Sequence, residues 1–126
     1  MAQDCCGSDG DIMILACSGG SNVGQLANQA AVELTQDGFG KFFCLAGIGA
    51  HLSGFVQSAK DAPGLVVIDG CSVGCSKGVI EHTAVPLKDY MVITAMGIEK
   101  NKNFKLNPED VARVKQAVKD TVQKPK

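Results

Sequence analysis

Four short stretches of this 126-residue chain are predominantly apolar, and they restrict the fold more than any other feature of the sequence. They cover residues 12–17, 42–46, 65–68 and 90–96. An apolar run without polar alternation is typical of a strand that is covered on both faces, and such strands occur in parallel sheets. The sequence therefore predicts a mostly parallel sheet of about four strands.

Helical patterns separate these runs and follow the last of them. They cover about residues 23–34, 51–60 and 71–82, and the third should be short because it contains two glycines. A last helix is expected from Pro108 onward, since Asn107 is a favourable N-cap and proline suits the first helical position. The apolar faces of the first and last helices comprise Val23, Leu26, Ala27, Ala30, Ala31 and Leu34, and Val111, Val114, Val118 and Val122.

The alternation of strands and helices predicts a single α/β domain of the doubly wound type, with three layers and right-handed crossovers. The composition agrees, because 45% apolar and 20% charged residues are ordinary for one globular domain of this length. We expect residues 11–126 to form the domain and residues 1–10, which are rich in glycine and aspartate, to be a flexible segment.

Charge and hydropathy exclude several classes of function. Twelve basic and thirteen acidic residues give a net charge of -1, so no chain-wide positive field favours nucleic acid or anionic lipid. No apolar run reaches the roughly 18 residues that a membrane span needs. The first eleven residues carry three acids and no apolar run, unlike an export signal, and we expect a cytoplasmic protein. The seven basic residues in 101–126 are interpreted as a solvated helix face and tail.

Six cysteines are the main chemical feature of the chain. Without an export signal they point to metal ligation, thiol chemistry or simple burial rather than to disulfides. Cys17 ends the first expected strand, Cys44 lies near the end of the second, and Cys71 follows the third by two residues. Cys75 would share the first helical turn with Cys71 if that helix starts at residue 71 or 72. Because parallel strands end at one edge of a sheet, the four thiols are expected there together.

This arrangement suits a soft metal ion. Four thiolates at about 2.3 Å make a closed zinc site, whereas three leave one position open. Copper(I) and iron–sulfur clusters also accept thiolates. Glycines crowd the same turns, which indicates loops built around something bound: Gly19, Gly20, Gly24, Gly47, Gly49, Gly70 and Gly74. Cysteine is also a common core residue, and Cys44, which follows two phenylalanines, is the clearest candidate for that role.

Three segments carry a specific resemblance. Residues 16–25 (ACSGGSNVGQ), 44–49 (CLAGIG) and 69–77 (DGCSVGCSK) together resemble the DGC-domain family, which is named for its Asp-Gly-Cys motif. The resemblance implies one zinc ion per chain held by four cysteines, with no established reaction. Carried over by motif, these are Cys17, Cys44, Cys71 and Cys75. Cys5 and Cys6 lie outside the motifs and are interpreted either as exposed bystanders or as extra ligands.

The turn after the first strand has the glycine spacing of a nucleotide-binding P-loop but not its chemistry. Gln25 replaces the required lysine, and Val23 stands where a Cys-x5-Arg phosphatase needs its arginine. Nucleotide hydrolysis and phosphatase chemistry are therefore disfavoured. The backbone amides around Ser18, Gly19 and Gly20 could still hold a small anion, or the turn could be a helix cap alone.

Other polar side chains near the motifs have two interpretations each. Asp69 either accepts hydrogen bonds from loop amides or forms a hydrogen bond that orients a metal ligand. Lys77 either stabilises thiolate charge or is solvated. His51 is a candidate fifth donor or proton carrier. His82 at the end of a helix is interpreted as structural, because a histidine there meets the helix dipole favourably.

The first hypothesis is therefore a zinc-binding protein without an assigned reaction. A second is a thiol-dependent reductase or transferase in which one of Cys71 and Cys75 attacks a thiol or disulfide substrate and the other resolves the product. Their Cys-x3-Cys spacing is less typical of redox enzymes than Cys-x-x-Cys. A third is a binder of small anions or metabolites that uses the turn at residues 18–24.

Overall fold

The computed structural model describes residues 12–123 of the chain. The expectations about a flexible segment at residues 1–10, and about Cys5 and Cys6 within it, lie outside the described residues. No helix within residues 12–123 is both long and apolar enough to cross a membrane.

The centre of the fold is a four-stranded parallel sheet with the order β2-β1-β3-β4. Its strands are β1 (Ile12–Ala16), β2 (Lys41–Phe42), β3 (Gly64–Asp69) and β4 (Asp89–Val92). β1 pairs along its whole length with β3, from Ile12 opposite Gly64 to Ala16 opposite Ile68. The chain winds outward from β1 in one direction to β2 and in the other to β3 and β4, so the strand order reverses between β1 and β3.

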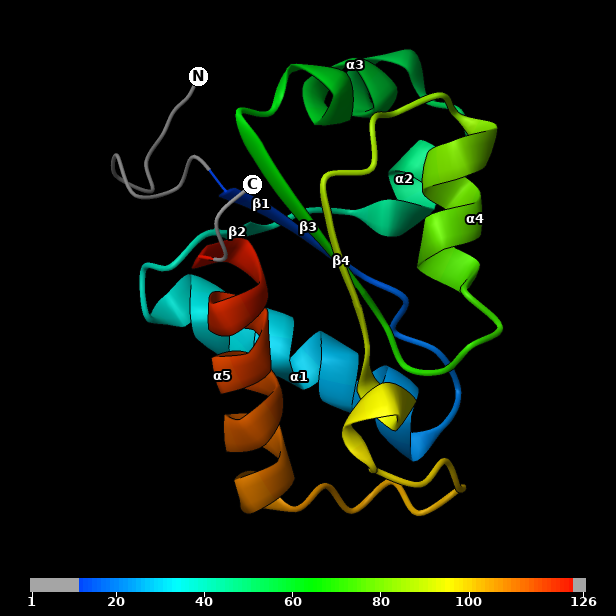
Figure 1. Cartoon of the computed structure of the whole chain (residues 1–126). Helices are drawn as coiled ribbons and strands as arrows, with labels where there is room; N and C mark the ends of the chain where they lie inside the picture. Colours follow the sequence, from blue (N-terminus) through cyan, green and yellow to red (C-terminus); the bar gives the residue numbers. More distant parts are fainter. Residues whose placement is uncertain (1–11, 124–126) are drawn as a thin grey trace.

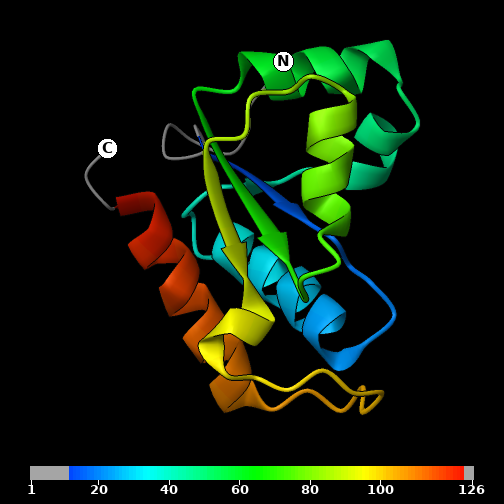
Figure 2. The ribbon, with the colours of Figure 1, turned by 45° about the vertical axis from the view of Figure 1, so that its right-hand side comes forward.

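Helices cover both faces of this sheet, which confirms the predicted three-layer α/β fold (Figures 1 and 2). One layer consists of α1 (Asn22–Gln36) and α5 (Pro108–Gln123). The other contains α2 (Leu45–Gly49), α3 (Ser53–Asp61) and α4 (Cys75–His82). A short 3-10 helix, η2 (Ile93–Met96), follows β4.

Each face of the sheet has its own hydrophobic core, which explains why the strands are apolar at consecutive positions. Toward α1 and α5 the sheet presents Ile14, Ala16, Val66 and Ile68. Toward the other helices it presents Leu15, Leu65 and Val67, which belong to a cluster with Ile48, Ala59 and Ile80. A strand whose successive side chains are both buried cannot alternate apolar with polar residues.

The boundaries of the two long helices agree with their sequence signals. The Ser21 hydroxyl accepts a hydrogen bond from the Gly24 amide and caps α1. Just beyond α1, Gly38 has a left-handed φ of 85°. The side chain of Asn107 accepts from the amide of Glu109 at 2.8 Å, as expected for the cap of α5.

Two predicted strands are shorter than the sequence suggested. β2 comprises only residues 41–42, and Cys44 is the N-cap of the unpredicted helix α2. α2 packs closely on α3, since a Cβ on Gly47 would lie 2.5 Å from the ring of Phe55. The second apolar run, residues 42–46, therefore ends in the first residues of a helix instead of continuing as a strand. Likewise, the last run ends as a strand at Val92 and continues as η2.

The expectation that the helix after β3 starts at residue 71 or 72 is wrong. α4 starts at Cys75, directly after Gly74, whose φ of 72° lies in the left-handed region and cannot continue a right-handed helix backward. Cys71 is therefore on the turn before the helix. The two cysteines do not share a helical turn, and the i, i+4 argument for bringing them together does not apply.

Candidate functional site

A cavity of about 190 Å³ lies at the edge of the sheet where the strand order reverses, between the turns that follow β1 and β3. We call it the thiol cavity because three of the predicted cysteines line it. Its lining residues are Cys17, Gly19, Gly20, Ser21, Gly24, Gly70, Cys71, Val73, Cys75, Lys100 and Lys102. This is the position at which open α/β sheets commonly bind ligands.

Glycines allow the turns around the thiol cavity to pack backbone against backbone. A Cβ on Gly24 would lie 2.4 Å from the carbonyl oxygen of Gly19. A Cβ on Gly70 would lie 2.8 Å from the amide nitrogen of Gly24. Real Cβ atoms do not approach other atoms so closely. Gly24 therefore lets the start of α1 pack against the Gly19 backbone within one turn, and Gly70 lets the turn after β3 pack against the start of α1.

Asp69, the first residue of the Asp-Gly-Cys motif, organises the start of α4. Asp69 is only 1% exposed, and its carboxylate accepts three hydrogen bonds. The amides of Ser76 and Lys77 donate to it at 2.7 and 3.1 Å, and the hydroxyl of Tyr90 donates at 2.7 Å. Backbone amides at a helix start otherwise lack partners. Asp69 thereby fixes the first turn of α4, which begins with Cys75.

Cys17 is half-buried beside the motif loop. Its sulfur accepts a hydrogen bond from the amide of Gly70 at 3.4 Å. Burial raises the pKa of the Cys17 thiol, and the amides of Gly19 and Gly70 offset only part of that increase. The charges of Asp69 and Cys75 raise this pKa further. Cys17 thus keeps its proton to higher pH than an ordinary thiol unless a positive ligand displaces it.

Two lysines from the chain after β4 complete the rim of the thiol cavity. Nζ of Lys100 donates to Sγ of Cys71 at 3.4 Å, and Nζ of Lys102 donates to the carbonyl of Gly20 at 2.7 Å. Cys71 is half-buried and Cys75 is exposed. No local pattern in the sequence points to Lys100, and Lys102 is one of the basic residues for which the sequence predicts only solvation.

A buried asparagine holds this lysine segment in place. Asn22 at the start of α1 donates from its side-chain amide to the carbonyl of Glu99 at 2.8 Å. The side-chain Oδ1 of Asn22 accepts a hydrogen bond from the backbone amide of Asn101 at 2.6 Å. The backbone amide of Asn22 donates to the Asn101 carbonyl at 2.9 Å. Lys100 lies between these two anchored residues. Its position over the cavity is consequently fixed by α1, at the other end of the sequence.

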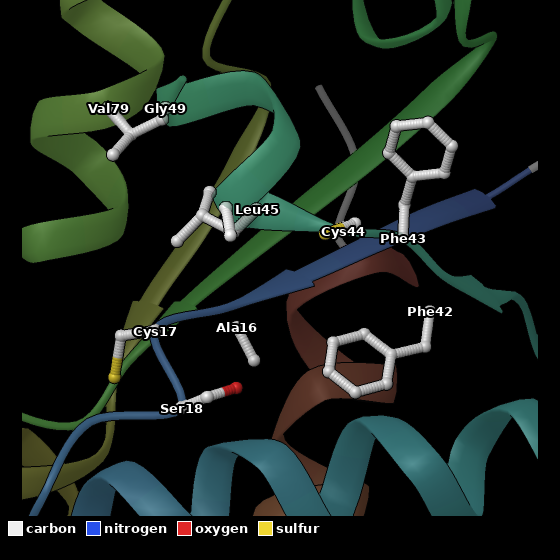
Figure 3. A pocket seen from close by; sticks show the side chains of 10 residues that line it. Ala16, Cys17, Ser18, Phe42, Phe43, Cys44, Leu45, Gly49 and Val79 are labelled. Carbon is white, nitrogen blue, oxygen red and sulfur yellow. The ribbon is translucent and has the colours of Figure 1, made fainter. Parts of the chain in front are cut away.

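Cys44 does not line the thiol cavity. Its sulfur is exposed and accepts from the Gly47 amide at 3.4 Å, as the cap of α2. It lines a neighbouring, mainly apolar cavity of about 330 Å³ whose wall also includes Cys17 and Phe42. Figure 3 shows Cys17 and Cys44 well apart, the first on the loop after β1 and the second beside β2. The structure therefore brings three of the four motif cysteines to one cavity and leaves Cys44 in the next.

The four cysteines that the structure describes are free thiols. Among the described residues, no group of three or more His, Cys, Asp or Glu side chains is arranged to hold a metal ion. The sulfurs of Cys17 and Cys71 instead accept hydrogen bonds from Gly70 and Lys100.

The turn at residues 18–24 uses several of its backbone amides in hydrogen bonds within the chain. The amides of Ser21, Asn22, Gly24 and Gln25 already donate within the chain. The Ser18 hydroxyl donates to Asn28 at 2.8 Å at an exposed position. The turn thus caps α1 through Ser21 and forms a wall of the thiol cavity, to which Gly19 and Gly20 contribute.

The remaining candidate residues lie outside the lining of the thiol cavity. The ammonium of Lys77 lies 5.5 Å from the ring centre of Tyr90, a cation–π contact. His51 lies beside His82 at the surface, where the two rings contact each other. The sequence did not indicate this contact, because the two histidines are 31 positions apart.

Comparison with known proteins finds a family model and a relative that each match most of this chain. The family model of the DGC domain matches residues 13–118. The Anaerobic and virulence modulator AnvM of Pseudomonas aeruginosa is 31% identical over 103 residues, which cover 81% of this chain and 78% of that protein. No solved structure matches the chain significantly.

Proposed function

The chain belongs to the DGC-domain family, and on this basis we propose that it binds one zinc ion, or a similarly soft metal ion, through Cys17, Cys71 and Cys75. The observation that carries the proposal is that these three thiols, from two turns at the reversal of strand order, line one cavity. Sulfur donors without oxygen ligands favour zinc, copper(I) or iron–sulfur clusters over calcium or magnesium.

The surroundings of the cavity suit the charge of such a site. Three thiolates around one divalent ion carry a net charge of -1. Lys100 and Lys102 lie at the rim and supply nearby positive charge. An ion would also replace the proton that Cys17 otherwise retains. The donor set therefore fits a soft cation, provided that the sulfurs of Cys17 and Cys71 exchange their present hydrogen bonds for the metal.

The proposal assigns no ligand role to Cys44, although the family resemblance implied four cysteines. Its sulfur caps α2 and borders a different cavity. Three protein ligands leave one coordination position for water or substrate, and such an open position is what catalytic zinc sites have. The free thiols of the described residues also suit a reducing compartment such as the cytoplasm.

Metal analysis of single-cysteine variants tests this function. The untagged chain is purified without oxygen, loaded with one equivalent of zinc and desalted, and its zinc content is measured. The wild type and Cys44→Ser are expected to retain about one zinc per chain, whereas Cys17→Ser, Cys71→Ser and Cys75→Ser lose most of it. Wild-type protein that retains no zinc, or five proteins with equal zinc content, would refute the proposal.

A second candidate function is thiol chemistry at Cys71, favoured by the ammonium of Lys100 at 3.4 Å from its sulfur. A positive group beside a sulfur favours the reactive thiolate. In this function the Cys71 thiolate attacks a substrate disulfide and releases one substrate thiol, and Cys75 then displaces the second. The chain ends with a Cys71–Cys75 disulfide and is two hydrogens lighter. Mass spectrometry of the metal-free protein after reaction with oxidised glutathione detects that product.

A further inference from the structure

The imidazoles of His51 and His82 meet at the surface of the helical layer formed by α2, α3 and α4. Nε2 of His51 lies 3.2 Å from Nδ1 of His82, and the ring centres are 5.1 Å apart with the rings edge to face. Both side chains are exposed and neither lines the thiol cavity. The pair borders its own open cavity of about 290 Å³, together with Gly49, Gly78, Val79 and Thr83.

The backbone holds both histidines at this position. His82 is the last residue of α4. His51 follows α2 with a φ of 60°, a left-handed conformation that is uncommon for a residue other than glycine, and its amide donates to the carbonyl of Ile48 at 2.9 Å. A Cβ on Gly49 would lie 3.6 Å from Val79, so α2 and α4 approach closely beside the pair. Backbone conformations of this kind are common at ligand sites.

We propose that His51 and His82 together bind a divalent transition-metal ion of the type that prefers imidazole, such as Zn²⁺, Ni²⁺ or Cu²⁺. Two imidazole nitrogens at about 2.0–2.1 Å from one tetrahedral ion are about 3.3 Å apart, close to the separation found here. A hydrogen bond between these two nitrogens requires a proton on one of them. On binding, the ring that carries this proton becomes the other neutral tautomer, with the proton on its outer nitrogen, so both inner nitrogens can bind the metal.

The site differs from the thiol cavity in ligand type and in accessibility. Among the described residues no third His, Cys, Asp or Glu completes a metal-binding group with the pair. Water can fill the other coordination positions through the open cavity. The bound ion is therefore exchangeable, and it links the end of α4 to the chain between α2 and α3.

Paramagnetic Ni²⁺ and NMR of the untagged, full-length wild type test the site directly. Low equivalents of Ni²⁺ should broaden the amide signals of Gly49, Gly78 and Thr83, whether or not signals around the thiol cavity also broaden. In His51→Gln and His82→Gln, at least about tenfold more Ni²⁺ should be needed for the same broadening, because each variant lacks one ligand. Lys60→Gln, an exposed change on α3, is the control and should respond like the wild type.

A wild type whose Gly49, Gly78 and Thr83 signals stay sharp would overturn the proposal. So would equal broadening of these signals in the wild type and in both histidine variants. The spectra themselves show whether each variant is folded, and the result does not depend on whether the thiol cavity binds metal.

Discussion

Nζ of Lys100 lies 3.4 Å from Sγ of Cys71, although 29 positions separate the two residues. The contact depends on Asn22, whose side chain binds the backbone of Glu99 and Asn101 on either side of the lysine. A positive charge is therefore held beside one particular thiol of the cavity. This arrangement distinguishes Cys71 from Cys75, which also lines the cavity but which no lysine ammonium of the described residues contacts in this way.

Replacing Lys100 should slow the chemistry of Cys71 selectively. In Lys100→Gln the sulfur loses its positively charged donor, so we expect several-fold slower alkylation of Cys71 by iodoacetamide in the metal-free protein. Tandem mass spectrometry of the peptide that contains both Cys71 and Cys75 measures the two rates separately. Lys60→Gln, which removes an exposed charge from α3, should leave both rates unchanged. An unchanged Cys71 rate in Lys100→Gln would show that the contact has no chemical effect.

Asp69 should contribute much more to stability than a surface carboxylate. Asp69→Asn replaces one acceptor oxygen by an amide group that faces donors, and we expect a loss of about 2–4 kcal/mol in the free energy of unfolding. Tyr90→Phe removes only one of the three donors and should cost about 1 kcal/mol. Urea denaturation of the metal-free protein measures both values. Equal losses in the two variants would contradict the role of Asp69 at the start of α4.

Two glycines in first helical turns should respond oppositely to alanine. Gly24→Ala in α1 places a methyl group against the Gly19 carbonyl, and we expect a loss of at least about 2 kcal/mol. Gly54→Ala in α3 meets no atom within 4 Å, so the higher helix propensity of alanine should stabilise the protein by up to about 1 kcal/mol. Thermal and urea unfolding measure the difference. A stable Gly24→Ala protein would mean that the Gly19 backbone does not lie against the start of α1 as described.

The pKa of Cys17 predicts how stability changes with alkaline pH. Because this pKa is higher in the folded than in the unfolded chain, the folded state binds more protons in the interval between the two values. The free energy of unfolding should therefore decrease as pH rises above the ordinary thiol range of about 8.5.

Burial and the hydrogen bond to Asp69 raise the pKa of Tyr90 as well, which acts in the same direction at still higher pH. The contribution of Cys17 is isolated by comparing variants. Cys17→Ser should have a flatter dependence of stability on alkaline pH than the wild type, in urea denaturation of the reduced, metal-free protein. Cys44→Ser changes an exposed thiol and should keep the wild-type slope. A wild-type slope in Cys17→Ser would rule out this source of pH dependence.

The sheet and its long helices could be predicted because local patterns determine them. Strands covered on both faces need consecutive apolar residues, as in β1 and β3, and the caps at Ser21 and Asn107 act within a few residues. The start of α4 could not be predicted in this way. It depends on the left-handed Gly74 and on the Asp69 carboxylate, which lies at the end of a strand.

The candidate site was predicted only as far as strand topology determines it. Parallel strands end at one edge, and Cys17, Cys71 and Cys75 line one cavity there, whereas Cys44, which was expected with them, lines the neighbouring cavity. Lys100 reaches that cavity only because α1 anchors its segment, and His51 meets His82 only because α2 packs against α4. Contacts between elements so distant in sequence leave no periodicity or spacing that a single sequence could reveal.

X-ray absorption spectroscopy of the zinc-loaded protein tests the central claim most directly, because it identifies the atoms bound to the metal. The account predicts three sulfur neighbours at about 2.3 Å and one lighter neighbour in both the wild type and Cys44→Ser. A zinc ion surrounded only by nitrogen and oxygen atoms in the wild type would contradict metal binding in the thiol cavity.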